Sequence, residues 1–334
     1  MRDDDRLLDL PNPEFGSGVV GVCDICGTRQ AVVVLSKERF RLCVLDFLNK
    51  TWLQTDKKPG APVPLYRSDR IWFETSAVPG RRAPAIVLSP TKVVRHPAVL
   101  VVPDIYGITT TVLDAAIRFA RQGFEVLIPD LSKTEGISTT PMVVARGSAR
   151  VRRGVATGSK EVVRLVRLCE DAFGALLARE MVDTTRTAVF GTSFGASVAL
   201  AFAAQSTRLG AVVLAYPMPV RPAELPSLVS APLLCVVGSA DRSSAAAVAQ
   251  LRAPGGAEGV AVEEIPDAGH HFLARDLRGY DLARAEEGWE KIVAFLRARL
   301  MPAPPTPPPP PAKPAGGALP ASAPAPAAGR PSVA

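Results

Sequence analysis

The residues of this sequence most able to do covalent chemistry surround Ser193, in the run Gly191-Thr192-Ser193-Phe194-Gly195. A Gly-x-Ser-x-Gly pattern exposes a nucleophilic serine when it forms a sharp turn between a strand and a helix. Here the apolar run TRTAVFG precedes the pattern and the small-residue run SFGASVALAFAAQ begins at the serine. The context therefore predicts a nucleophile at Ser193, against the alternative of a tight turn that contains an idle serine.

Serine needs a general base, and that base needs a carboxylate to orient it. Asp241 follows the apolar run PLLCVVG, and two adjacent histidines follow the run GVAVEEIP about thirty residues later. We favour His270 as the base over His271, because the glycine before it suits a sharply turned loop. Asp241 is the expected acid, with a helix N-cap as its alternative role. Asp267 is the rival acid, but it lies too near the histidines in sequence to approach from a separate strand.

A hydrolytic serine also requires two backbone N–H groups that stabilise the negative oxygen of the tetrahedral intermediate. The N–H of Phe194, which follows the nucleophile, is the first candidate. The second should come from the loop after the apolar run AVLVV, which reads Pro103-Asp104-Ile105-Tyr106-Gly107.

These residues must be positioned by a sheet, and the sequence alternates short apolar runs with longer runs of helical spacing. Such alternation predicts an α/β fold with a mostly parallel, doubly wound sheet. The near-continuous apolar strands are those expected of a sheet buried on both faces. Strands are expected at IWFETS, PAIVLSP, AVLVVPD, FEVLIPD, TRTAVFG, GAVVLAYP, PLLCVVG and GVAVEEIP, and helices at TTTVLDAAIRFARQG, SKEVVRLVRLCEDAFGALLARE, SFGASVALAFAAQ and 282–300.

Together, the runs VVPDIYGIT, GFEVLIPDL and AGHHF resemble the dienelactone hydrolase family of α/β-hydrolases, over roughly residues 98–300. The resemblance implies an α/β-hydrolase fold and a catalytic triad of Ser193, Asp241 and His270. It implies that Ile105 and Phe194 supply the oxyanion N–H groups. It also implies an ester, lactone or thioester substrate and no cofactor for catalysis.

Two residues depart from the family pattern. The best-known members carry Cys at the position of Ser193, and Glu at the position of Asp104. Asp104 is therefore either a pocket residue or only a turn residue, and we leave both readings open. Tyr106 and His271 are the other candidate pocket residues.

A separate cluster of three cysteines lies near the N-terminus. Cys23 and Cys26 form a Cys-x2-Cys pair, and Cys43 and Asp46 fall at the start of a helical pattern. Between them, AVVVL and RFRLC alternate like the two strands of a hairpin. A knuckle, a hairpin and two ligands at a helix start resemble a treble-clef zinc finger, with a closed structural zinc site. The alternative is a short appendage with reduced thiols.

Composition bounds the rest of the chain. The 334 residues are 47% hydrophobic, with five cysteines and a net charge of +7. No apolar run is long enough to predict a membrane span, and no signal peptide is recognisable, so we expect a cytoplasmic protein. No aromatic residues interleave with the densest arginine cluster, which argues against a nucleic-acid partner. The expected organisation is a flexible tail (1–18), a zinc-finger-like unit (19–56), a linker (57–65), an α/β-hydrolase domain (66–300) and a disordered Pro/Ala-rich tail (301–334).

A rival hypothesis needs no catalysis. In it, the hydrolase fold is a rigid scaffold, and the N-terminal unit or the Pro-rich tail binds a protein partner. Labelling by a serine-directed probe would distinguish the two hypotheses.

Overall fold

The computed structural model describes most of the chain between Tyr66 and Met301, together with four short N-terminal strands. The described residues are 21–22, 30–31, 33–35, 40–42, 66–105, 107–131, 133–134, 137–138, 155–254, 259–275, 277 and 279–301. The expected flexible tail (1–18), the linker (57–65) and residues 302–334 lie outside this set, as do most of 19–56.

Within the N-terminal segment the described residues form two antiparallel pairs. Strand β1 (Gly21–Val22) pairs with β2 (Gln30–Ala31), and β3 (Val33–Leu35) pairs with β4 (Phe40–Leu42). The second pair confirms the hairpin predicted from AVVVL and RFRLC. The four predicted zinc ligands, Cys23, Cys26, Cys43 and Asp46, lie outside the described residues.

The main domain is built on an eight-stranded sheet in the order β16-β15-β13-β12-β7-β8-β6-β5. The five neighbouring pairs from β16 to β8 are parallel, and β5 and β6 add two antiparallel pairs at one edge. This arrangement confirms the predicted α/β fold with a mostly parallel sheet. The strands are β5 (Tyr66–Thr75), β6 (Arg81–Pro90), β7 (His96–Val102), β8 (Glu125–Pro129), β12 (Val182–Thr192), β13 (Ala211–Ala215), β15 (Leu233–Gly238) and β16 (Val260–Ile265).

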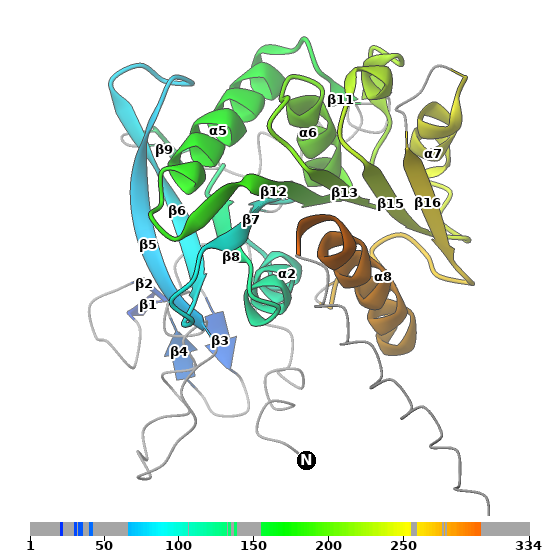
Figure 1. The fold of residues 1–334 in the computed structure, drawn as a ribbon. Coiled ribbons are helices and arrows are strands. Elements are labelled where there is room, and N and C mark those ends of the chain that lie inside the picture. Colours follow the sequence, from blue (N-terminus) through cyan, green and yellow to red (C-terminus); the bar gives the residue numbers. More distant parts are fainter. Residues whose placement is uncertain are drawn as a thin grey trace, which may run out of the picture. The chain divides into compact units, whose positions relative to one another are not determined.

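Helices cover both faces of the sheet, so its central strands are buried on both sides (Figure 1). One face packs against α2 and α8, and the other packs against α5, α6 and α7. The central strand β7 is wholly buried, which explains why its sequence is a near-continuous apolar run. The helices are α2 (Thr110–Arg121), α5 (Lys160–Leu177), α6 (Ser193–Ala203), α7 (Ala245–Arg252) and α8 (Leu282–Leu300).

The sequence contains the start and stop signals of these helices. The Ser159 hydroxyl accepts a hydrogen bond from the backbone N–H of Val162 at 3.3 Å, so it caps α5. Gly123 ends α2 with a φ of 92°, a left-handed conformation that glycine adopts without strain. Asp281 caps α8 by accepting from the backbone N–H of Arg284.

Shorter elements connect this framework. Strand β9 (Lys133–Thr134) pairs with β10 (Ile137–Ser138), and β11 (Val155–Ala156) pairs with β14 (Val220–Arg221). A 3-10 turn, η3, spans Leu225–Leu228.

The parallel strands bring the predicted chemical groups together. Strands β7, β12, β15 and β16 run in the same direction, so their carboxyl ends lie at one edge of the sheet. The predicted oxyanion loop, nucleophile, acid and base follow these four strands in that order. The topology therefore places four separate segments of the sequence at a common edge.

Candidate active site

The turn between β12 and α6 has the strained geometry of a nucleophile elbow. Ser193 is the first residue of α6 and has a φ of 50°, a left-handed conformation that costs a non-glycine residue about 1–2 kcal/mol. The residue is 6% exposed. Strain held at a single polar residue often marks a functional site.

The two glycines of the motif are required by close backbone contacts. A Cβ on Gly191 would lie 2.5 Å from the carbonyl oxygen of Gly195, across the turn. A Cβ on Gly195 would lie 2.5 Å from the carbonyl oxygen of Pro103, at the end of β7. Any side chain at either position would therefore force the backbone of the turn apart and displace Ser193.

Asp241 lies in the loop between β15 and α7, and the two oxygens of its carboxylate have different partners. Oδ1 accepts hydrogen bonds from the backbone N–H groups of Ser243 at 2.8 Å and Ser244 at 3.2 Å. Oδ2 lies 2.7 Å from Nδ1 of His270. The alternative role of helix N-cap is wrong, because the N-cap of α7 is Ser244; Asp241 instead binds N–H groups of the preceding loop and faces the candidate base.

The environment of Asp241 favours its charged form. Burial raises the pKa of this carboxyl, but the hydrogen bonds from His270 and Ser244 outweigh burial and hold the pKa below its ordinary value. Asp241 can therefore act as a fixed negative charge beside the imidazole.

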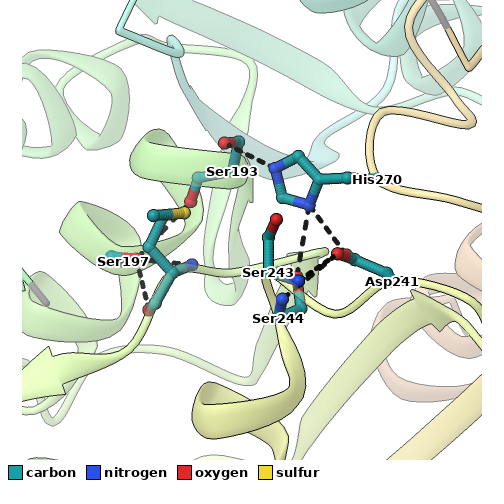
Figure 2. A network of polar contacts seen from close by, with 7 residues as sticks. Ser193, Ser197, Asp241, Ser243, Ser244 and His270 are labelled. Carbon is teal, nitrogen blue, oxygen red and sulfur yellow. Dashed lines mark hydrogen bonds and ion pairs between the residues drawn. The ribbon is translucent and has the colours of Figure 1, made fainter. Parts of the chain in front are cut away.

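His270 joins the acid to the nucleophile. Its Nε2 lies 3.3 Å from Oγ of Ser193, while Nδ1 faces Asp241 (Figure 2). A separation of 3.3 Å is at the long end of hydrogen bonding, as is common before substrate binds. The structure thus brings Ser193, His270 and Asp241, from three separate segments of the sequence, into one connected series of side-chain contacts.

His271 occupies a different environment from its neighbour. Its backbone has a φ of 65°, and its ring packs edge-on against those of His270 and Tyr216 at 4.1 and 5.5 Å between centroids. Its Nδ1 is buried and has no hydrogen-bond partner among the described residues. Burial, followed by the proximity of His270, lowers the pKa of His271 to about 4. Of the two candidate bases, only His270 lies between the serine and the carboxylate.

The predicted oxyanion loop has one unexpected feature. The N–H of Ile105 donates to Oδ1 of its neighbour Asp104 at 2.6 Å, so this donor is already engaged. The Asp104 carbonyl also accepts from the N–H of Gly107, which closes a turn. Asp104 therefore has the local contacts of a turn residue. Phe194 is the second residue of α6, directly after the nucleophile, and Tyr106 lies outside the described residues.

Several site residues were missed by the sequence analysis. The buried Ser197 hydroxyl donates to the carbonyl of Met218 at 2.7 Å and accepts from its N–H at 3.0 Å. This pair of bonds ties the loop after β13 to α6, one turn beyond Ser193. In that loop, the Tyr216 ring packs edge-on against His270 at 5.2 Å. The four-residue spacing from Ser193 to Ser197 on one helix face was the available signal.

The remaining histidine and cysteines of the main domain have structural environments. His96 is 4% exposed, and its two ring nitrogens face the carbonyl oxygens of Gly123 and Lys92, at the opposite end of β7 from the oxyanion loop. Cys169 and Cys235 are fully buried, and burial raises the pKa of both thiols. Both are therefore unreactive in the folded protein.

No group of three or more His, Cys, Asp or Glu side chains in the described part of the chain could hold a metal ion. Over the same residues, no helix is both long and apolar enough to cross a membrane.

Comparison with known proteins places the chain in a family. The sequence profile described as "Dienelactone hydrolase family" matches residues 83–300. The carboxymethylenebutenolidase of Rhodococcus opacus is 28% identical over 218 residues, which cover 60% of this chain and 81% of that protein.

Solved structures show the same fold. A dienelactone hydrolase-like promiscuous phosphotriesterase from metagenomic libraries has a TM-score of 0.54 at 18% identity, covering 70% of this chain and 98% of that one. A cold-adapted esterase from an Arctic intertidal metagenomic library has a TM-score of 0.52 at 17% identity, covering 72% and 96%.

Proposed function

This chain belongs to the dienelactone hydrolase family and is a hydrolase, and we propose that it cleaves an ester, lactone or thioester through an acyl-enzyme on Ser193. The observation that carries the proposal is the connected chain from Ser193 through His270 to Asp241, with distances of 3.3 and 2.7 Å. A serine paired with a base, which is itself oriented by a carboxylate, is the arrangement that activates a hydroxyl nucleophile.

In the acylation step, Oγ of Ser193 attacks the carbonyl carbon of the substrate. Its proton passes to Nε2 of His270, and the carbonyl oxygen takes the electron pair of the broken π bond. The imidazolium that forms is stabilised by the ionised carboxylate of Asp241. His270 then returns the proton to the leaving oxygen or sulfur, which departs as an alcohol or thiol; in a lactone this group stays attached to the acyl chain.

The developing negative charge requires backbone donors at the elbow. The N–H of Phe194 is the first, at the positive end of the α6 dipole. The N–H of Ile105 is the second, and it becomes available when the Asp104 carboxylate releases it. Substrate binding therefore has to displace one hydrogen bond of 2.6 Å before both donors can act.

Deacylation repeats these steps with water as the nucleophile. His270 removes a proton from water, the hydroxide adds to the acyl carbon, and Oγ of Ser193 leaves with the returned proton. The products are a carboxylic acid and the free serine. No cofactor is needed for this sequence, because every proton and electron pair is supplied by the triad, the substrate and water.

The proposal is tested by covalent labelling and by turnover. A fluorophosphonate probe should label wild-type protein at Ser193, and Ser193→Ala should abolish labelling and lower kcat for p-nitrophenyl esters by about 10⁴-fold. Ser206→Ala, three residues beyond the end of α6, is the matched serine control and should retain labelling. Persistent labelling of the Ser193→Ala protein at another residue would defeat the assignment. A folded wild-type protein that is silent to both probe and esters would favour the scaffold hypothesis instead.

A further inference from the structure

Ser244 is the N-cap residue just before α7, but its side chain does not cap the helix. A serine at a helix N-cap usually accepts a hydrogen bond from a backbone N–H two or three residues on. The Ser244 side chain makes no such cap bond, although it is the N-cap residue and is fully buried. Its hydroxyl instead lies 3.4 Å from Nδ1 of His270. The Ser244 side chain therefore contacts the candidate triad and leaves the start of α7 uncapped.

Ser244 contacts both the candidate acid and the candidate base. The backbone N–H of Ser244 donates to Oδ1 of Asp241 at 3.2 Å, and Oδ2 of the same carboxylate faces Nδ1 of His270 at 2.7 Å (Figure 2). A hydroxyl can donate one hydrogen bond and accept others. The Ser244 oxygen can therefore accept from the imidazole N–H while the backbone N–H of the same residue holds the carboxylate.

The other groups around the imidazole contact its ring faces or Nε2, and they do not face Nδ1. Tyr216 and His271 pack edge-on against the ring at 5.2 and 4.1 Å, and Ser193 faces the opposite nitrogen. The groups that face Nδ1 are Asp241 and Ser244. These two residues therefore set the orientation of the imidazole ring, and they favour the tautomer that carries its proton on Nδ1.

We propose that Ser244 is a positioning residue of the hydrolytic site, whose backbone N–H holds the Asp241 carboxylate and whose hydroxyl holds Nδ1 of the His270 imidazole beside it. This inference rests on the proposed function of the triad. Ser244 does not touch the reacting atoms; it acts through the acid and the base.

The direction of its effect follows from the contact between the Ser244 hydroxyl and the imidazole. The hydroxyl oxygen lies 3.4 Å from Nδ1 of His270, which is long for a hydrogen bond, and it can accept from the imidazole N–H. An acceptor beside this N–H favours the protonated imidazole over the neutral one, so its removal should destabilise the protonated base.

The experiment compares Ser244→Ala with Ser239→Ala in the intact chain. Ser239 lies in the same loop after β15, and its hydroxyl accepts from the backbone N–H of Asp267 at 2.9 Å, so it also binds the histidine loop. It touches none of the triad. For each protein, kcat/KM for p-nitrophenyl acetate is measured against pH, and folding is checked by thermal melting.

We expect Ser244→Ala to lower kcat/KM on the plateau by about three- to tenfold, the effect of one lost hydrogen bond. Its acid limb should move to lower pH by about half a unit. Ser239→Ala should keep the wild-type acid limb. A cap or packing role would change the melting temperature and leave the pH profile in place. If Ser244→Ala does not fold, Ser244→Cys, which retains a weak acceptor of similar size, should show a smaller shift in the same direction.

The outcomes separate the two proposals. An acid limb of the folded Ser244 variant that coincides with wild type, or moves to higher pH, overturns the role of Ser244 and leaves the triad intact. Equal shifts in the Ser244 and Ser239 variants also overturn it, because loop tethering alone would then explain them. Wild-type activity that survives Ser193→Ala undoes the proposed function itself.

Discussion

The half-buried second histidine makes the stability of this protein sensitive to acid. Burial is the main reason that the pKa of His271 falls from its ordinary 6.5 to about 4, and its Nδ1 has no partner among the described residues. The unfolded chain has no such burial, so there the histidine takes up a proton as pH falls through its ordinary value. Between about pH 6.5 and pH 4 the unfolded state therefore binds more protons than the folded state, and folding stability declines.

The size of this loss can be worked from the two pKa values. Their difference of 6.5 − 4 corresponds to about 3 kcal/mol of unfolding free energy, at about 1.4 kcal/mol for each pH unit. The side chain is only half-buried, so solvent screening reduces the expected effect to about 2 kcal/mol. Above pH 6.5 none of this unfolding free energy has been lost, and below about pH 4 no more of it is lost.

The assay is urea unfolding of wild type and His271→Asn at about pH 7.5 and pH 4.5, followed by tryptophan fluorescence. Asn tolerates the left-handed backbone of this position, where φ is 65°, and carries no titrating group. Wild type should lose about 2 kcal/mol more than the variant between the two pH values. The difference between the proteins cancels every other titrating group that they share. Equal losses in both proteins would refute the reasoning, because His271 would then not be the proton acceptor.

Three further predictions follow from close contacts in the main domain. Gly195→Ala should lower kcat at least about a hundredfold by displacing the elbow, whereas Gly174→Ala, whose Cβ meets nothing within 4 Å, should retain activity; equal kcat values would contradict this. Arg179→Ala should cost about 3–5 kcal/mol in urea unfolding, because it leaves the buried Glu125 carboxylate without its ion-pair partner, and a loss under about 1 kcal/mol would be inconsistent with it. Asp104→Ala should raise kcat for p-nitrophenyl esters about threefold or more by freeing the neighbouring backbone N–H, and a fall in kcat would instead indicate that the carboxylate assists catalysis.

Local pattern was enough to predict the architecture of the main domain. The apolar run AVLVV predicted a strand, and β7 is buried along its whole length. The helix predicted over residues 282–300 matches α8, and Ser159 caps α5 as expected. These features depend on the periodicity of burial and on hydrogen bonds between residues a few positions apart. The periodicity and these short-range hydrogen bonds both depend on residues that are close together in the sequence, so they can be predicted from it.

The candidate nucleophile could be found for the same reason. The elbow is a local structure, and the glycines at positions 191 and 195 are needed by backbone atoms of the turn and of β7 that approach within 3 Å. The order of nucleophile, acid and base along the chain then pointed to Asp241 and to a pair of histidines. At that stage the choice between His270 and His271 depended only on a neighbouring glycine.

Only the tertiary structure separates these two imidazoles. Adjacent residues in a loop point in different directions, and a left-handed backbone at His271 turns its ring away from the hydrogen bonds that His270 makes. The engagement of Ile105 by Asp104 and the turn of the Ser244 hydroxyl toward the imidazole were likewise invisible in the sequence. Residue types and spacing determine which groups reach one edge of a parallel sheet. Which atoms then meet at hydrogen-bonding distance depends on side-chain directions set by several loops at once, and no single stretch of sequence encodes that.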